Sequence, residues 1–146
     1  PPIYPPFRES AANHGRRRID VPLRHDPDGV WHLDLGGVSR AMADGAGTIL
    51  LCHPHNPTGN SLPSAELAEL IDLAGRHDVV IVSDEIHAPL TMPGCNHTPL
   101  IHLHPLATDV VVTLTSASKA WNLAGLKCGI KTQRIRLILT AQPLSF

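Results

Sequence analysis

The chain has 146 residues, enough for one domain with a hydrophobic core. Hydrophobic residues make up 42 % and charged residues 17 %, a composition typical of globular rather than disordered proteins. Thirteen acidic and twelve basic residues give a net charge of -1, so the chain lacks the basic field that attracts nucleic acid. The longest apolar runs, 48–52 and 79–82, are too short to span a bilayer, and residues 1–10 do not have the pattern of a signal peptide. We therefore expect a cytoplasmic protein that binds neither nucleic acid nor membranes.

The spacing of the cysteines argues against a disulfide framework. The histidine pairs allow two interpretations: a metal site, or histidines that lie in loops. The three cysteines show no CxxC spacing: Cys52, Cys95 and Cys128. The pairs His53/His55 and His102/His104 could each place two imidazoles on one face of an extended segment, as a metal site requires. Neither pair is joined by a cysteine or carboxylate at ligand spacing. Histidines in loops are the alternative, and we expect no metal.

The first third of the chain contains one predicted helix and one predicted strand. Residues 1–23 include four prolines in the first six positions and show no regular period. Residues 34–47 (DLGGVSRAMADGAG) are amphipathic and predict a short helix that ends near Gly45 and Gly47. Residues 47–52 (GTILLC) form an apolar run before a Pro/Asn/Gly cluster, which predicts a strand.

The middle of the chain predicts a βαβ unit. Residues 64–78 (SAELAELIDLAGRHD) predict a helix with Ser64 as N-cap and Glu66 in the first turn. Its apolar residues recur at helical spacing and define the face expected to be buried: Leu67, Leu70, Ile71 and Ala74. Residues 79–84 (VVIVSD) and 110–116 (VVVTLTS) are β-branched runs that predict strands. Continuous apolar runs of this kind are typical of strands buried on both faces of a parallel sheet.

Reactive residues follow each predicted strand at its carboxyl end. The three segments are 53–59 (HPHNPTG), 83–87 (SDEIH) and 115–119 (TSASK). Because ligands bind at the carboxyl ends of parallel strands, we expect these segments to meet at one edge of the sheet. Each segment also has a structural explanation, since Asn56 and its following proline form turns and Asp84 could cap a helix.

Lys119 stands among small hydroxyl side chains, and an apolar segment precedes it. This placement predicts that its amine is carried into the interior, although a lysine stem can also reach solvent. Desolvation and a cationic neighbour favour the neutral amine, which is the form that acts as a nucleophile or base.

Three motifs give the chain a resemblance to the fold-type I enzymes of the aminotransferase class I/II superfamily, which use pyridoxal phosphate (PLP). They are NPTG at 56–59, DEIH at 84–87 and SASKAWNLAGLKCG at 116–129. With PHNPTG and the HTPL at 97–100, the chain most resembles the carbon–sulfur β-lyase branch of the cystathionine β-lyase type. The resemblance runs from about residue 2 to residue 129.

The resemblance implies a role for each residue of the three motifs around the cofactor ring. Lys119 corresponds to the amine that holds PLP covalently. Asp84 corresponds to the carboxylate that keeps the pyridine nitrogen protonated, so that the ring withdraws electrons from the substrate Cα. Asn56 and His87 correspond to residues that contact the phenolic oxygen of the ring.

The resemblance also implies phosphate and stacking residues. Ser116 and Ser118 resemble phosphate ligands, and Lys127 stands where relatives often carry an arginine for the same phosphate. Tyr4 corresponds to an aromatic residue that stacks on the cofactor ring, and a partly exposed loop tyrosine is the alternative. The peptide bond between Asn56 and the next proline is a candidate for the cis form.

By this resemblance the fold is α/β, part of the three-layer α/β/α large, PLP-binding domain with a mostly parallel sheet. Residues 1–129 would form the central part of that domain, and the small C-terminal domain would be absent. Residues 130–146 look atypical, and we interpret them as the product of a truncation or a frameshift. A full-length protein would be a homodimer.

The resemblance implies a PLP-dependent β-lyase that acts on cystathionine or a cysteine-like amino acid and releases a thiol, pyruvate and ammonia. An aminotransferase is the close alternative, because it uses the same cofactor residues. A catalytically incompetent remnant of such an enzyme is the second alternative.

Overall fold

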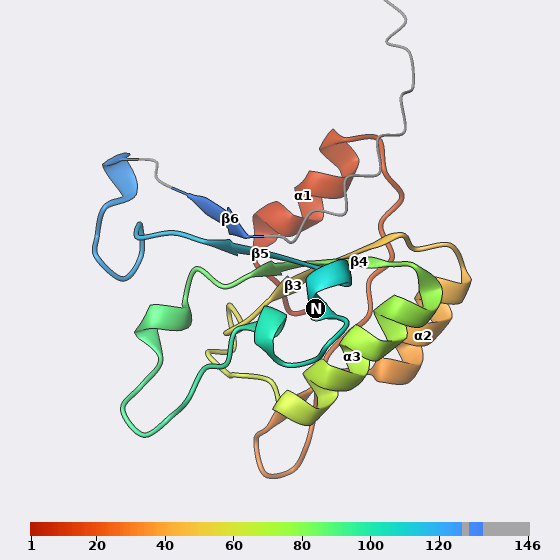
Figure 1. Ribbon diagram of the computed structural model, residues 1–146, viewed down its shortest axis with the longest axis horizontal. Helices are drawn as coiled ribbons and strands as arrows, with labels where there is room; N and C mark the ends of the chain where they lie inside the picture. The colour runs from red at the N-terminus through yellow and green to blue at the C-terminus, as the bar shows by residue number, and fades with distance from the viewer. Residues whose placement is uncertain (127–128, 133–146) are drawn as a thin grey trace, which may run out of the picture.

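The computed structural model describes residues 1–126 and 129–132 (Figure 1). Its helices and strands, in chain order, are α1 (Pro5–Asn13), β1 (Arg24–His25), β2 (Trp31–His32), α2 (Leu35–Ala43), β3 (Thr48–Cys52), α3 (Ser64–His77), β4 (Val80–Asp84), α4 (Ala107–Val110), β5 (Val111–Thr115) and β6 (Ile130–Thr132). Three short 3-10 helices cover Ala88–Leu90, Leu100–His102 and Ala124–Leu126. Among the described helices, none combines the length and apolar character that crossing a membrane requires.

The central sheet has four strands in the order β3-β4-β5-β6. The first three are parallel, which confirms the three strands predicted from the apolar runs and the βαβ unit between β3 and β4. β6 pairs antiparallel with β5. The sequence did not predict β6, because three residues are too few for a periodic signal and their conformation depends on pairing with β5. The rest of the segment interpreted as an atypical tail, 133–146, lies outside the described residues.

α3 packs its apolar face against the sheet. The residues predicted to be buried are at most 1 % exposed: Leu67, Leu70, Ile71 and Ala74. The predicted N-cap is wrong, because Pro63 takes that position and Ser64 is already helical. The carbonyl of Pro63 accepts the first hydrogen bond, from the Leu67 N–H at 3.1 Å, so the helix begins one residue earlier than an N-cap at Ser64 would place it.

α2 lies beside α3 on one side of the sheet, and α1 lies on the other side (Figure 1). Asp34 caps α2 by accepting a hydrogen bond from the Gly37 N–H at 3.0 Å, and Gly45 follows the helix with a φ of 88°, as its position in the sequence predicted. α1 was not predicted. Prolines are tolerated in the first turn of a helix, so the proline-rich start is compatible with a helix that begins at Pro5.

The two faces of the sheet are buried to different extents, which corrects the expectation of strands buried on both faces. Leu51, Ile81 and Val111 face α2 and α3 and are 7 % exposed or less. On the opposite face, Leu50 and Leu114 remain more than a third exposed. The difference arises because α1 is a nine-residue helix with no buried residue, and it covers only part of that face.

A hairpin of β1 and β2, which the sequence analysis missed, joins the N-terminal segment to α3. Its turn carries the signal Asp-Pro-Asp-Gly at 26–29, and the Val30 N–H donates to the Asp26 carboxylate at 2.7 Å. The Glu66 carboxylate, predicted in the first turn of α3, accepts a hydrogen bond from the Leu33 N–H at 2.7 Å and contacts the His32 ring. Glu66 therefore ties the hairpin to the helix.

Candidate active site

The carboxyl ends of the three parallel strands meet at one edge of the sheet, as expected. Cys52 pairs with Asp84 in the register of β3 and β4, and Asp84 pairs with Leu114 of β5. A cavity of about 110 Å³ lies at this edge. Seven residues from four segments of the chain line it: Tyr4, Cys52, Asn56, Asp84, Ile86, His87 and Lys119. Five of them are residues that the sequence analysis selected.

Asp84 is the last residue of β4 and is partly buried. One carboxylate oxygen accepts a hydrogen bond from the Ile86 N–H at 3.1 Å, so the side chain closes the turn that follows the strand. Its main-chain carbonyl accepts a hydrogen bond from the His53 N–H at 2.9 Å, which links the ends of β3 and β4. Asp84 is therefore held at both its side chain and its main chain.

Asn56 lies in the turn that follows β3. The Asn56–Pro57 peptide bond is cis, as is the His53–Pro54 bond. The thiol of Cys52 organises this turn, because it donates to the Pro54 carbonyl and accepts from the Asn56 N–H, each at 3.4 Å. Cys52 was missed as a lining residue, although its position directly before the HPHNPTG segment could have indicated it. Burial raises the pKa of the Cys52 thiol, and the nearby Asp84 charge adds to the shift.

Lys119 lines the cavity but is exposed, so the expectation that its amine is buried is wrong. The physical reason is its place in the fold: it lies in the turn that follows β5, beyond the last residue of the sheet, and not in the layer of strands. The Lys119 carbonyl accepts a hydrogen bond from the Asn122 N–H at 3.4 Å. This turn directs the lysine toward the same small cavity as Asp84.

Ser116 and Ser118 lie on the same turn as Lys119 and are partly buried. Their hydroxyl groups are hydrogen-bonded to each other, and the Ser118 N–H donates to the Ser116 hydroxyl at 3.0 Å. Neither serine lines the cavity itself. The other predicted phosphate residue, Lys127, lies outside the described residues.

Tyr4 and His87 complete the lining of the cavity from two further segments. Tyr4 precedes α1, is 42 % exposed and makes an edge contact with the ring of Phe7 at 6.2 Å between centroids. His87 is partly buried, and its carbonyl accepts a hydrogen bond from the Leu90 N–H at 2.9 Å. The N-terminal segment thus contributes Tyr4 to the cavity, in agreement with the place that the resemblance to PLP enzymes implied for this residue.

The histidine pairs considered for a metal have different environments. His53 and His55 lie in the irregular segment after β3, so they are loop histidines as the alternative stated, and both are buried. Their side chains make separate contacts: the His53 ring packs against that of His97, and the His55 Nδ1 is 2.9 Å from the Thr58 hydroxyl oxygen. Within residues 1–126 and 129–132, no three histidine, cysteine, aspartate or glutamate side chains form a group suited to a metal ion.

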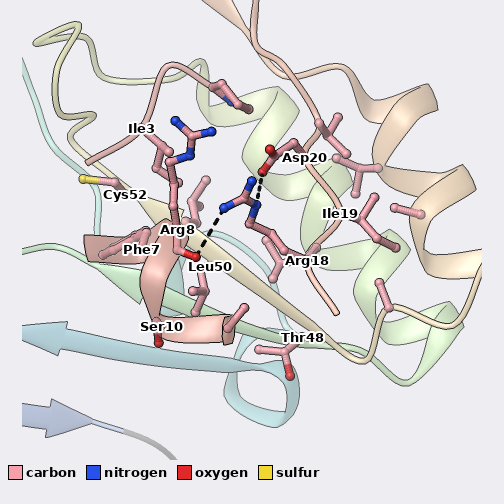
Figure 2. A pocket seen from close by; sticks show the side chains of 18 of the residues that line it. Ile3, Phe7, Arg8, Ser10, Arg18, Ile19, Asp20, Thr48, Leu50 and Cys52 are labelled. Carbon is pink, nitrogen blue, oxygen red and sulfur yellow. Dashed lines mark hydrogen bonds and ion pairs between the residues drawn. The ribbon is translucent and has the colours of Figure 1, made fainter. Parts of the chain in front are cut away.

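A larger cavity of about 760 Å³ lies between α1, the segment after it and the face of β3 (Figure 2). Apolar side chains such as Phe7 and Leu50 line it together with arginines. Figure 2 shows Arg18 held between its ion-pair partner Asp20, at 3.1 Å, and the main-chain carbonyl of Arg8, at 3.3 Å. None of the predicted cofactor residues that the structure describes lines this cavity, so the smaller cavity is the candidate active site.

The chain is similar to known PLP enzymes over most of its length. The model of the family "Aminotransferase class I and II" matches residues 1–144. A cystathionine β-lyase of Corynebacterium glutamicum is 41 % identical over 127 residues, which cover 87 % of this chain and 32 % of that protein. A histidinol-phosphate aminotransferase of Colwellia psychrerythraea is 36 % identical over 129 residues, covering 88 % of this chain and 34 % of that protein.

The fold is also similar to solved structures. Cystalysin of Treponema denticola, whose crystal structure contains PLP, superposes with a TM-score of 0.86 at 29 % identity, covering 92 % of this chain and 34 % of cystalysin. An α/β domain with a mostly parallel sheet and reactive residues at the strand ends defines a fold-type I PLP enzyme domain. The chain belongs to the aminotransferase class I and II family, and it spans about a third of the length of the relatives it matches.

Proposed function

We propose that the chain is the cofactor-binding part of a PLP-dependent carbon–sulfur β-lyase. One observation carries this proposal: a single small cavity is lined by a carboxylate, an amide, an imidazole, an aromatic ring and an amine from four segments of the chain. The similarity to cystathionine β-lyases supports the same assignment. In this proposal residues 1–129 belong to the central part of the large, PLP-binding domain.

The chemical groups of the residues at the cavity match those that the parts of PLP require. The Asp84 carboxylate suits a protonated pyridine nitrogen, the Asn56 amide and the His87 imidazole suit the phenolic oxygen, and the Lys119 amine suits the aldehyde. The cavity, at about 110 Å³, is smaller than most ligand sites, so it would hold only part of the cofactor. The hydroxyl groups of Ser116 and Ser118, on the turn beside it, are suited to the phosphate.

PLP, when bound, would withdraw electrons from the substrate Cα and so allow a group on Cβ to leave. Asp84 would keep the pyridine nitrogen charged by placing a negative carboxylate beside it. The exposed amine of Lys119 would bind the cofactor covalently and, once released by the substrate, would move the Cα proton. We propose an amino acid with a sulfur leaving group on Cβ, such as cystathionine, as the substrate.

Absorption spectroscopy tests the cofactor proposal directly. Titration of the purified chain with PLP should produce the visible band of lysine-bound PLP, and Lys119→Ala should abolish it. Lys131→Ala is the matched control, because Lys131 is exposed on β6 and does not line the cavity. If the unchanged chain gives no band at any PLP concentration, it is the incompetent remnant considered above.

An aminotransferase is the second candidate function, and the similarity to a histidinol-phosphate aminotransferase supports it. Assays of the longer protein with cystathionine, with and without 2-oxoglutarate, distinguish the two. A lyase should release pyruvate and a thiol in both conditions. Turnover that strictly requires the keto acid would contradict the lyase proposal and leave the PLP proposal intact.

We propose further that the longer protein is a homodimer in the cytoplasm. Exposed apolar side chains follow His87 and Lys119 in the chain and support an interface near the cavity: Leu90, Met92, Trp121 and Leu123. Cys52 and Cys95 are free thiols, which fits a reducing compartment. Analytical ultracentrifugation of the longer protein tests the dimer.

A further inference from the structure

A buried polar cluster lies on the face of the sheet opposite the candidate active site. Its centre is Glu85, which directly follows Asp84 and is 3 % exposed. Glu85 lies one residue beyond β4, does not line the cavity, and contacts the side chain of Ser83, which points to the face of β4 opposite that of Asp84. The Glu85 N–H donates to the Leu114 carbonyl at 2.8 Å, so the contact between the ends of β4 and β5 continues through this residue.

The Glu85 carboxylate accepts hydrogen bonds from four groups in three parts of the chain. The Ser83 hydroxyl on β4 and the Leu100 N–H each donate at 3.0 Å, and the Thr113 hydroxyl on β5 donates at 3.4 Å. The fourth contact, from His97 Nε2 at 3.0 Å, is a pair in which both side chains are at most 8 % exposed. These contacts join β4, β5 and the HTPL segment at 97–100 behind the site.

The cluster holds a buried negative charge. Burial acts to raise the pKa of Glu85, but the hydrogen bonds from His97, the Leu100 N–H and Ser83 outweigh it, and the pKa lies below its usual value. The imidazole of His53 packs against that of His97 at 4.9 Å between centroids. Burial lowers the pKa of His53 to about 4, so this neighbour is neutral near pH 7.

Stability alone does not explain this cluster. Well-packed apolar residues of similar volume are often as stable as a buried ion pair. The Nδ1 atoms of His53 and His97 are buried and have no hydrogen-bond partner among the residues that the structure describes, which is unfavourable. An ionised side chain retained here, one residue from a carboxylate in the active site, points to a role at that site.

We propose that Glu85 is a positioning residue for Asp84: its hydrogen bonds fix the end of β4 so that Asp84 faces the cavity, and its charge favours a protonated ring beside Asp84. This inference rests on the proposed binding of PLP. The charged or titratable side chains that face Glu85 are His97, from the segment after the loop at 88–95, and His53, from the end of β3. β5 contributes the neutral hydroxyl of Thr113.

A pH titration of the visible band of PLP bound to the chain tests the proposal. Glu85→Gln is nearly isosteric and removes one negative charge. The midpoint of the titration should fall by about one pH unit, because loss of a nearby negative charge disfavours the protonated cofactor. Glu85→Asp keeps the charge, so its midpoint should stay close to that of the unchanged chain. Glu69→Gln, an exposed position on α3, is the matched control and should leave the midpoint unchanged.

The outcomes separate this inference from the proposed function. A band in the unchanged chain with the same midpoint in folded Glu85→Gln would overturn the role of Glu85 and leave PLP binding intact. The absence of a band in the unchanged chain would overturn both. If circular dichroism shows that Glu85→Gln is partly unfolded, the titration is repeated in trimethylamine N-oxide, which favours the folded state.

Discussion

Cys52 lies directly opposite Asp84 in the parallel register of β3 and β4, and both side chains line the same small cavity. The thiol is 3 % exposed and spans the turn after β3 through its contacts with the Pro54 carbonyl and the Asn56 N–H. An unreactive thiol is what this position requires, because a reactive one beside a PLP aldehyde would compete with the lysine.

We therefore expect Cys52 to react slowly with thiol reagents. Burial raises the pKa of its thiol above the usual 9.0, whereas Cys95 is exposed. Treatment with iodoacetamide at pH 8, followed by peptide mass spectrometry, should show Cys95 modified at least ~10-fold faster than Cys52. In urea the two rates should become similar. Equal rates in the folded protein would contradict the burial of Cys52.

The pH dependence of the free energy of unfolding should show the effect of the lowered pKa of His53. Its pKa is lowered from 6.5 to about 4 in the folded chain, so the unfolded state binds a proton more readily between these values. The free energy of unfolding should therefore decrease as the pH falls from 6.5 toward 4, by ~2 kcal/mol. Urea denaturation at pH 7 and pH 4.5 measures the change. His53→Asn should remove most of it, whereas His102→Asn, at an exposed position, should not.

His32 should make the free energy of unfolding decrease as the pH rises above 6.5, which is the opposite of the effect of His53. Hydrogen bonds to Glu66 and Asp26 raise its pKa, so the folded state holds the proton more firmly than the unfolded state does. Its contribution to stability is fully present below pH 6.5 and is lost as the pH rises through the raised pKa. NMR titration of the His32 ring should give a pKa above 6.5. A pKa of His32 at or below 6.5 in the wild type, or a pKa that does not decrease in Glu66→Gln, would contradict the contact between His32 and Glu66.

The sequence predicted the parts of the fold whose signal is local. The apolar runs of β3, β4 and β5 and the helical spacing of Leu67, Leu70 and Ile71 each identify an element without knowledge of its partners. The polar segments after the strands then predicted where the site lies, because the carboxyl ends of parallel strands share one edge, whereas the individual residues, Tyr4 included, were selected by the resemblance to PLP enzymes.

The features that the sequence did not predict, or predicted wrongly, depend on contacts between residues far apart in the chain. β6 forms by pairing with β5, and the polar environment of Glu85 depends on His97 and Leu100 from a later segment. The exposure of Lys119 follows from its place in a turn beyond the sheet, which the preceding apolar run does not indicate. Local periodicity carries no information on such contacts.

Asp84 provides the most direct test of the proposed chemistry. Asp84→Asn keeps the size of the side chain and an oxygen that can accept from the Ile86 N–H, but it removes the negative charge. Lys119 remains, so the visible band of bound PLP should persist. Turnover of cystathionine by the longer protein should fall ~100-fold or more, because an uncharged pyridine ring stabilises negative charge at the substrate Cα poorly. The parallel Asn60→Asp variant, in the turn after β3 but outside the cavity lining, should keep near-normal turnover. Unchanged turnover in Asp84→Asn would show that another group protonates the ring and would remove Asp84 from the proposed site.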